Sequence, residues 1–281
     1  MVESLADEFA VWLPQCSAAI IAVPGPVCAG EAIDLPNVSW NITRRQLHES
    51  LPNIPDGRLI LINDFVAQGM ACLALPGSKC RYIQVGETVE LGLIATIGAG
   101  TGIGACALTL DTCGGHCVIP SEAGHQQFPF RSSEERRFEE FVIRKTGHKI
   151  VDANAVVSGP GLSMLHSFLT GSDSPPAEVA AQLALSSEVC RMFASFYARV
   201  AQAYTLSVLP LGGLYVTGGV AAQNPHLVDN DVFRAEFAAS PHHRPLLERI
   251  PIFLNENQES GLLGAACYAR MILRSHLQTV R

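Results

Sequence analysis

Four glycines at alternate positions form the segment of this sequence with the most evident chemical use. They lie in the stretch ATIGAGTGIGACAL and are Gly98, Gly100, Gly102 and Gly104. Glycine at every second position weakens a β-strand, because it removes the side chains that would pack on one face. In exchange, the backbone can be approached closely and can adopt φ values that other residues avoid. The exposed N–H groups of such a turn suit phosphate oxygens, so the stretch predicts a phosphate-binding β-hairpin.

Two known glycine motifs and a purely structural role compete with the phosphate hairpin. A dinucleotide-binding fingerprint, G-x-G-x-x-G, would have to open a helix. Counted from Gly98, the third glycine of that motif is replaced by Ile103, and the following residues ACALTLDTCGG alternate like a second strand. A Walker-type P-loop needs a Gly-Lys pair, which this sequence lacks. A hairpin whose glycines only let two sheets pack closely remains open, because glycine spacing alone does not exclude it.

Composition indicates a globular protein with a large core. The chain has 281 residues, of which 48% are hydrophobic and 16% charged, enough for one large α/β unit or two modest domains. A formal charge of −7 argues against nucleic-acid partners and against a polybasic membrane surface. No apolar run approaches the ~20 residues that a membrane-spanning helix needs. The N-terminal residues MVESLADEFAVW are acidic and do not resemble a signal peptide, so we expect a cytoplasmic protein.

Nine cysteines are scattered through the chain without a disulfide framework, which indicates reduced thiols. The segment from Cys113 to Cys117, with sequence CGGHC, offers two thiols and an imidazole that could hold zinc. However, no second ligand pair lies at zinc-finger spacing. A hairpin turn at the two glycines explains the segment more simply, so we expect no metal site there.

Apolar, strand-like runs lead into helical segments throughout the chain. The expected strands include Ala18–Val23, Arg58–Asn63 and Leu214–Thr217, and the expected helices include 134–146, 186–208 and 260–273. Polar residues at the ends of strands, where the next helix begins, are where open α/β sheets bind ligands. This order of strands and helices, repeated in two halves, predicts an α/β architecture with mixed sheets.

Four segments occur in one order: INDF, GAGTGIG, PSEAGH with SGPGL, and LYVTGG. Together with VPGPV and LPNVSW before them and GLLGAACYA after them, they resemble the bacterial glucokinase family, over roughly residues 18 to 270. The family belongs to the superfamily of sugar kinases, heat-shock-70 proteins and actin. The resemblance implies a two-domain, actin-like ATPase (ribonuclease H-like) α/β fold with mixed sheets, with the active cleft between the domains. The small domain would comprise residues 1–75 with a C-terminal helix at 264–281, and the large domain residues 76–263.

The resemblance also implies an activity, which is phosphorylation of the 6-hydroxyl of glucose by ATP and Mg²⁺, commonly in a homodimer. Asp64 matches the family's catalytic base and Asn63 a sugar ligand. Glu122 and His125 match the sugar-binding pair of the Glu-x-Gly-His segment, and Asn37 lies where an early turn reaches the sugar. The nucleotide-side matches are Gly98, Gly100, Thr101, Gly102 and Gly104 for phosphate, and Gly218 and Gly219 for adenosine.

The chemistry of these side chains agrees with the roles that the resemblance implies. An alcohol that attacks a phosphate needs a proton acceptor, and an ionised aspartate such as Asp64 is acceptor-only. Asn63, Glu122 and His125 suit the hydroxyls of a sugar, which both donate and accept. From the residues alone, Asp64 could instead cap a helix that begins at Val66, and a lone histidine is more often structural. The match to the family favours the base, and the spacing of His125 from Glu122 favours a ligand.

Two departures from the family pattern leave alternatives open. The family opens with a strand hairpin carrying Asp-x-Gly-Gly-Thr, which contacts the phosphates and helps to position magnesium, and no such segment occurs here. We therefore expect an N-terminally incomplete small domain with Ile20 and Ile21 exposed. Either the gene product is longer, or the chain is a sugar-binding or regulatory homologue, or it is a kinase for another hexose. In addition, Asn154 stands where the family has a sugar-binding glutamate, with Asp152 two residues away. We count Asn154 among the expected sugar ligands, and the substitution leaves the hexose open.

Overall fold

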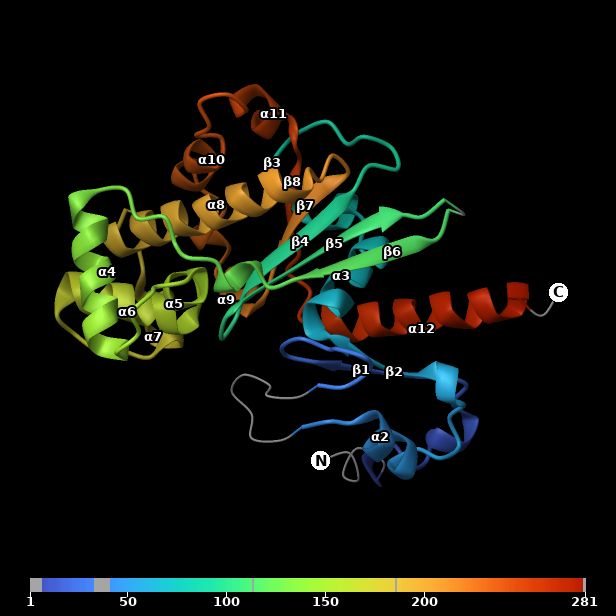
Figure 1. Ribbon diagram of the computed structural model, residues 1–281. Helices are drawn as coiled ribbons and strands as arrows, with labels where there is room; N and C mark the ends of the chain where they lie inside the picture. Colours follow the sequence, from blue (N-terminus) through green and yellow to red (C-terminus); the bar gives the residue numbers. More distant parts are fainter. Residues whose placement is uncertain (1–6, 33–40, 113, 185, 280–281) are drawn as a thin grey trace. The chain divides into compact units, whose positions relative to one another are not determined.

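Figure 1 shows the computed structural model of the chain, which describes residues 7–32, 41–112, 114–184 and 186–279. The chain divides into two compact units. Unit 1 comprises Met1–Ala74 with Glu259–Arg281, and unit 2 comprises Leu75–Gln258. Each unit has its own hydrophobic cluster of buried residues, so each is described separately.

Unit 1 contains, within the described residues, a two-stranded parallel sheet. Strand β1 (Ala19–Val23) pairs in register with β2 (Leu59–Asn63). Ile20 and Ile21 of β1 are half-buried, so the expectation that they are exposed is wrong. The helices are α2 (Arg44–Ser50), α3 (Asp64–Ala74) and α12 (Ser260–Thr279), with short 3-10 turns η1 (Leu13–Gln15) and η2 (Asp56–Arg58).

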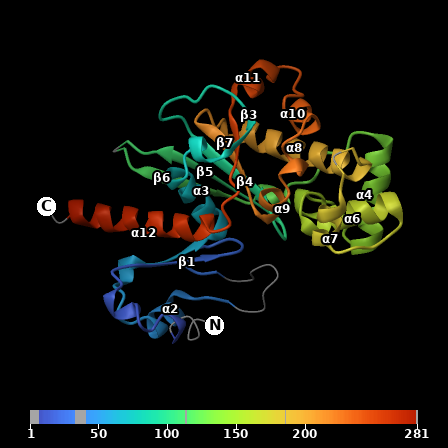
Figure 2. The same ribbon diagram turned by 180° about the vertical axis from the view of Figure 1, so that it is seen from behind.

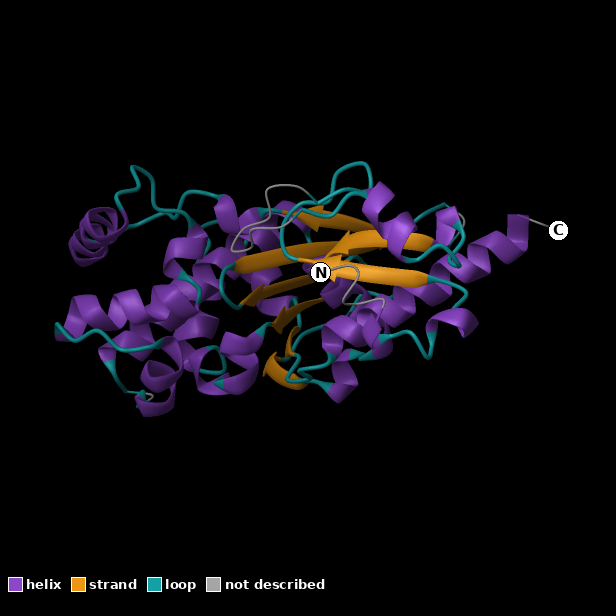
Figure 3. Ribbon diagram, turned by 90° about the horizontal axis from the view of Figure 1, so that it is seen from below, coloured by secondary structure: helices purple, strands orange, loops and turns teal. Residues whose placement is uncertain are grey.

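Helices α3 and α12 pack against each other, although nearly 200 residues separate them in the sequence. Figure 3 shows α12 as a continuous helix that leads to the C-terminus. A Cβ atom on Gly264 of α12 would lie 1.7 Å from the carbonyl oxygen of Ala67 in α3. Only glycine therefore allows the two helices to approach so closely. At the polar side of the contact, the Ser260 hydroxyl donates to Gln68 Oε1 at 2.7 Å.

Unit 2 is built on a sheet that has six strands among the described residues, in the order β3-β8-β7-β4-β5-β6. The strands are β3 (Arg81–Gln84), β4 (Ile94–Ala99), β5 (Ile103–Leu110), β6 (His116–Ser121), β7 (Gly213–Thr217) and β8 (Ile252–Leu254). The pairs β4–β7 and β7–β8 are parallel, whereas β3–β8, β4–β5 and β5–β6 are antiparallel. The sheet is therefore mixed, as the sequence predicts.

Figures 1 and 2 show α4, α5, α6 and α7 grouped beyond one end of this sheet. The long helix α8 runs from that group along the sheet, and most of its residues are buried. The helices of unit 2 are α4 (Ser133–Thr146), α5 (Ala153–Val156), α6 (Gly159–Thr170), α7 (Pro176–Gln182), α8 (Glu188–Val208), α9 (Gly219–Gln223), α10 (Asp231–Phe237) and α11 (Arg244–Arg249). Its 3-10 turns are η3 (Gly77–Lys79), η4 (Ala123–His125) and η5 (Pro225–Leu227).

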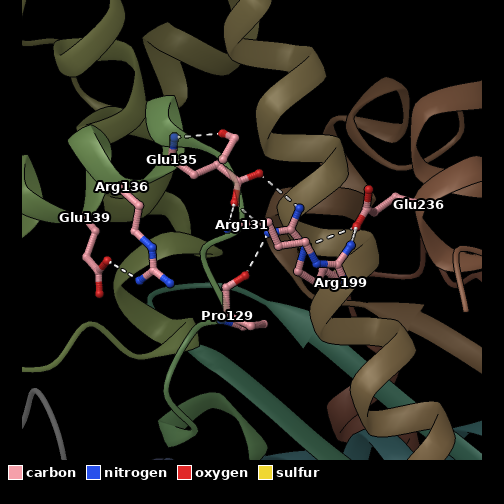
Figure 4. Close-up of polar contacts among 8 residues, drawn as sticks. Pro129, Arg131, Glu135, Arg136, Glu139, Arg199 and Glu236 are labelled. Atoms are coloured by element: carbon pink, nitrogen blue, oxygen red, sulfur yellow. Dashed lines mark hydrogen bonds and ion pairs between the residues drawn. The ribbon is translucent and has the colours of Figure 1, made fainter.

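A buried ion-pair network ties α4 and α10 to α8 (Figure 4). The guanidinium of Arg199 in α8 donates to both carboxylate oxygens of Glu135, at 2.8 and 3.1 Å, and to Glu236 at 3.1 Å. It also donates to the carbonyl oxygen of Pro129 at 3.0 Å, which anchors the segment that follows η4. The Arg199 side chain is only 4% exposed. A buried charge of this kind is tolerated because each of its partners is a hydrogen-bond acceptor.

Glu135 shows the electrostatic effect of this network. Burial by itself would raise the pKa of its carboxyl group. Hydrogen bonds from the Arg199 guanidinium and from the Arg131 amide outweigh burial, and the pKa is lowered below its ordinary value. The ionised carboxylate therefore stabilises the folded state above the pKa of the unfolded chain, and this contribution is lost as the pH falls through the lowered pKa.

We predict that Arg199→Leu lowers the free energy of unfolding by about 3 kcal/mol, because it leaves the half-buried Glu135 carboxylate without its cation and removes one of the two cations at Glu236. Denaturant unfolding at neutral pH measures this loss. The matched control is Arg191→Leu in the same helix, which removes an exposed ion pair with Glu188 and should cost less than about 1 kcal/mol. The penalty of Arg199→Leu should shrink in acid, as the pH falls through the lowered pKa of Glu135 and its carboxylate becomes protonated. Equal losses in the two variants at neutral pH would contradict this interpretation.

Candidate active site

The glycine segment is a β-hairpin, as predicted. Strands β4 and β5 pair antiparallel, with Gly98 opposite Gly104, and the Gly100 amide donates to the Gly102 carbonyl at 2.8 Å. A Cβ atom on Gly98 would lie 2.4 Å from the carbonyl oxygen of Thr217 in β7, so the close approach at this glycine is made by a neighbouring strand. The expectation of unusual φ values is wrong, because none of the four glycines has a positive φ. At Gly98, glycine is needed for space and not for conformation.

The second glycine pair lies directly against this hairpin. Strand β7 ends at Thr217, and Gly218 follows with φ +86°. A Cβ atom on Gly218 would lie 2.5 Å from the carbonyl oxygen of Ala99, at the end of β4. Helix α9 begins directly at Gly219. The two segments that resemble nucleotide-binding motifs are therefore adjacent in the fold.

Tyr197 of α8 connects the same two strand ends. Its hydroxyl accepts the Ala99 amide at 3.0 Å and donates to the Thr217 carbonyl at 3.5 Å. The side chain is fully buried, and burial raises the pKa of its hydroxyl group. The hydroxyl therefore keeps its proton and can act as donor and acceptor together.

Some backbone amides of the hairpin donate hydrogen bonds within the protein, and others do not. Three of them donate to Tyr197, Gly102 and Asn154. Those of Thr101 and Gly102, at the tip, donate to no acceptor in the described part of the chain. A bound anion could accept hydrogen bonds from these two neighbouring N–H groups.

A polar cluster gathers beside the hairpin, and it contains three residues that the sequence predicts as sugar ligands. Nε2 of His125, in η4, lies 3.8 Å from Glu122 Oε2. The Asn154 amide nitrogen lies 3.2 Å from His125 Nδ1. Asp152 Oδ2 lies 3.3 Å from the same Nδ1. Glu122, His125 and Asn154 are therefore brought together from two segments of the chain.

Backbone pairing holds these two segments side by side. The Phe128 amide donates to the Val151 carbonyl, and the Ala153 amide donates to the Gln126 carbonyl, both at 2.9 Å. This short antiparallel contact fixes η4 against the start of α5. Asp152 is not among the site residues that the sequence predicts, although its place two residues before the substituted Asn154 is a signal that could have found it.

Asn154 joins the polar cluster to the glycine hairpin. Its Oδ1 accepts the Ile103 amide, at the start of β5, at 2.6 Å. A Cβ atom on Gly124 would lie 2.4 Å from that Oδ1, so the glycine between Glu122 and His125 makes room for the bond. Groups suited to a sugar and groups suited to a phosphate therefore lie on one connected piece of backbone.

In unit 1, Asn63 and Asp64 lie where β2 ends and α3 begins. Asn63 Oδ1 accepts the amides of Phe65 and Val66 at 2.8 and 3.3 Å, and its Nδ2 donates to the Gly25 carbonyl at 2.9 Å. Asn63 thus caps α3, and the alternative in which Asp64 caps a helix beginning at Val66 is wrong, because Asp64 is already in the first turn. Asp64 Oδ1 accepts the Phe65 amide at 2.9 Å. Asn37 lies outside the described residues.

Three further features concern metal sites, membrane-spanning helices and cavities. Among the described residues, no group of three or more His, Cys, Asp or Glu side chains could hold a metal ion; Cys113 of the possible zinc segment lies outside them. No helix in the described ranges is long and apolar enough to cross a bilayer. A cavity of about 470 Å³ lies between α4, α6 and residues 173–176, and no residue that the sequence predicts for the site lines it.

Comparison with known proteins identifies the family. A profile of the family described as Glucokinase matches residues 1–272. The chain belongs to the glucokinase family. A glucokinase from a Nostoc species is 32% identical over 285 residues, which cover 90% of this chain and 82% of that protein. The resemblance that the sequence motifs indicated is therefore confirmed, and the chain is an enzyme of the glucose kinase type.

Solved structures agree with this family fold. Glucokinase from Balamuthia mandrillaris, in complex with glucose, has a TM-score of 0.77 at 21% identity, covering 95% of this chain and 80% of that one. A ROK family glucokinase from Streptomyces griseus, in complex with glucose and AMPPNP, has a TM-score of 0.60 at 16% identity. The match covers 96% of this chain and 87% of that one. The fold is that of the actin-like ATPase sugar kinases, as predicted.

We predict that Gly98→Ala lowers the free energy of unfolding by about 1–3 kcal/mol, because its Cβ meets the backbone of β7. Gly100→Ala is the matched control, since no atom lies within 4 Å of its Cβ position and neither glycine has a positive φ. It should change stability by no more than about 0.5 kcal/mol. Denaturant unfolding of the three proteins measures the difference, and equal effects would contradict the close approach.

Proposed function

We propose that the protein transfers the γ-phosphoryl group of ATP to the 6-hydroxyl of glucose. The observation that carries this proposal is the 2.6 Å hydrogen bond from the Ile103 amide to Asn154 Oδ1. Through this bond, a cluster of carboxylate, imidazole and amide groups adjoins a hairpin with two available amides. A kinase for a sugar needs both kinds of group close together.

Glu122, His125 and Asn154 are proposed to bind the sugar. The hydroxyls of a hexose both donate and accept hydrogen bonds, so carboxylate, imidazole and amide groups can each be satisfied by one. A site that depends on such bonds rejects analogues that lack a hydroxyl. Glucose as the sugar is supported by the Balamuthia relative, which was solved in complex with glucose.

The amides of Thr101 and Gly102 are proposed to hold phosphate oxygens of ATP. Backbone N–H groups that are already oriented stabilise the charge of a transferring phosphoryl group without reorganisation. Gly98, Gly100 and Gly104 are proposed to belong to the same phosphate-binding hairpin, and Gly218 and Gly219 to lie on the adenosine side, as the family resemblance implies. The Streptomyces relative, solved with AMPPNP, supports a nucleotide of the ATP class.

The ligands that Mg²⁺ ordinarily takes in kinases indicate how it would bind with ATP. Mg²⁺ in kinases usually takes one or two carboxylates and completes its shell with water and substrate phosphates. We therefore propose that Mg²⁺ enters with ATP, and that it neutralises charge on the phosphates when bound.

Asp64 is proposed as the general base, which accepts the proton of the attacking hydroxyl. Asn63 is proposed as a sugar ligand. One Nδ2 hydrogen of Asn63 donates to the Gly25 carbonyl, and the second remains for a hydroxyl oxygen. Asn37 keeps the role of a sugar ligand as a prediction from the sequence.

We further propose that units 1 and 2 correspond to the small and large domains of the family, although their boundaries differ by a few residues from the predicted ones. A homodimer and a cytoplasmic location remain predictions. They would be tested by light scattering of the purified protein and by fractionation of the source cells.

We predict that Asp64→Asn lowers kcat by about 10² to 10⁴-fold, the range in which general bases contribute. Binding of glucose should survive, because the amide oxygen of asparagine can still accept the Phe65 amide. Coupled turnover assays and calorimetry with glucose measure the two quantities. Asp231→Asn is the control, since that side chain is fully exposed. Near-normal turnover in Asp64→Asn would contradict the assignment of the base.

A kinase for another hexose remains the second candidate, because Asn154 stands where the family resemblance expects a glutamate. Glucose and mannose differ only in the configuration at carbon 2, and a site that hydrogen-bonds that hydroxyl discriminates between them. We predict that kcat/KM is higher for glucose than for mannose by about tenfold or more. The same coupled assay measures both values, and a preference for mannose would contradict glucose as the substrate.

A further inference from the structure

Asp152 has no role in the proposed reaction, yet its carboxylate faces a ring nitrogen of a proposed sugar ligand. We infer that Asp152 is a positioning residue that holds the hydrogen of the His125 imidazole on Nδ1, and thereby makes Nε2 an acceptor for a sugar hydroxyl. This inference rests on the proposed sugar-binding role of His125.

The geometry around His125 Nδ1 indicates that this nitrogen carries the hydrogen of the imidazole. Asp152 Oδ2 lies 3.3 Å from His125 Nδ1, and an ionised carboxylate can only accept. The contact is therefore a hydrogen bond only when Nδ1 carries the hydrogen. In a neutral imidazole the other nitrogen then has a lone pair and accepts.

Asn154 also contacts the His125 ring, but it does not determine which ring nitrogen carries the hydrogen. Its Nδ2 lies 3.2 Å from His125 Nδ1 and 3.3 Å from Nε2. The lone pairs of the two ring nitrogens diverge, so an atom at nearly equal distance from both lies off the axis of each. Hydrogen bonds weaken steeply with such misalignment. The Asn154 amide therefore contacts the imidazole without selecting the nitrogen that carries the hydrogen.

Asp152 is itself held in place before any ligand binds. Its Oδ1 accepts the Ala155 amide at 2.9 Å and so caps α5. Its neighbour Ala153 donates to the Gln126 carbonyl, which lies next to His125 in the chain. The Asp152 side chain is 29% exposed, against 58% for His125. A rigid carboxylate thus faces the more accessible imidazole.

The position of the hydrogen on the His125 imidazole affects which sugar hydroxyls can bind. With the hydrogen on Nδ1, Nε2 and the Glu122 carboxylate are both acceptors, 3.8 Å apart. One hydroxyl has a single hydrogen and cannot donate to both. Two hydroxyls on adjacent carbons can each donate to one of them, so this pair of acceptors suits a vicinal diol.

Asp152→Asn tests the inference because it replaces the carboxylate oxygen that faces His125 with an NH₂ group and keeps the oxygen that caps α5. The Ala155 amide is a donor, so the new side chain keeps its oxygen on the helix cap and turns its NH₂ group toward His125. A donor at that place favours the lone pair on Nδ1 and moves the hydrogen to Nε2. Asp231→Asn, at a fully exposed position, is the matched control.

The primary measurement is the tautomer of His125 at alkaline pH, read from the ¹⁵N chemical shifts of the imidazole in the protein without sugar or ATP. The His125 signals are assigned by their loss in His125→Gln. We expect hydrogen on Nδ1 in the wild type and in Asp231→Asn, and on Nε2 in Asp152→Asn. The same variant should raise KM for glucose about tenfold with little change in kcat, since the lost interaction serves binding.

Hydrogen on Nε2 in the wild type, or an unchanged tautomer or KM in Asp152→Asn, would overturn the inference. If Asp152→Asn does not fold, Asp152→Ser replaces it, because serine also caps helices and removes the carboxylate. That variant should lose the exclusive Nδ1–H signal, and retention of the signal would overturn the inference. If the wild type does not phosphorylate glucose, the proposed function fails, whereas the tautomer measurement still decides the role of Asp152.

Discussion

The close approach of two strand ends, β4 and β7, is the constraint on which the rest of unit 2 depends. Gly98 lies against Thr217, and Gly218 lies against Ala99, at distances that exclude a Cβ atom on either glycine. The buried Tyr197 hydroxyl bonds to both strand ends. Because these contacts fix the end of β4, they also fix the hairpin that follows it and the start of α9. Polar groups carried by the next segments can then be positioned against a rigid turn.

The hydrogen bond between Asn154 and the Ile103 amide extends this rigidity to the polar cluster. The segment that carries His125 is held on one side by backbone pairing with residues 151–153 and on the other by Arg199, which binds the Pro129 carbonyl. Sugar-type and phosphate-type groups therefore share one scaffold. Phosphoryl transfer depends mainly on orientation and on charge stabilisation, and preorganised groups of this kind provide both.

Much of this arrangement can be predicted from the sequence, because it rests on local signals. Alternating glycines between β-type residues predict the hairpin, apolar spacing predicts α8, and the order of the motifs predicts the family. Contacts between distant segments cannot be predicted in this way. Strand β3 forms through pairing with β8, and the pairing of Asp152 with His125 depends on a backbone register that no local pattern encodes. The cap of α3 is ambiguous for a different reason, since Asn63 and Asp64 are neighbours and both residue types cap helices well.

Identification of the product tests the central claim most directly. The purified chain is incubated with glucose, ATP and Mg²⁺, and the mixture is followed by ³¹P NMR. Phosphoryl transfer to the 6-hydroxyl predicts that glucose 6-phosphate and ADP appear in equal amounts, and that no ADP appears without glucose. ADP release that does not depend on glucose, or phosphate on another hydroxyl, would contradict it.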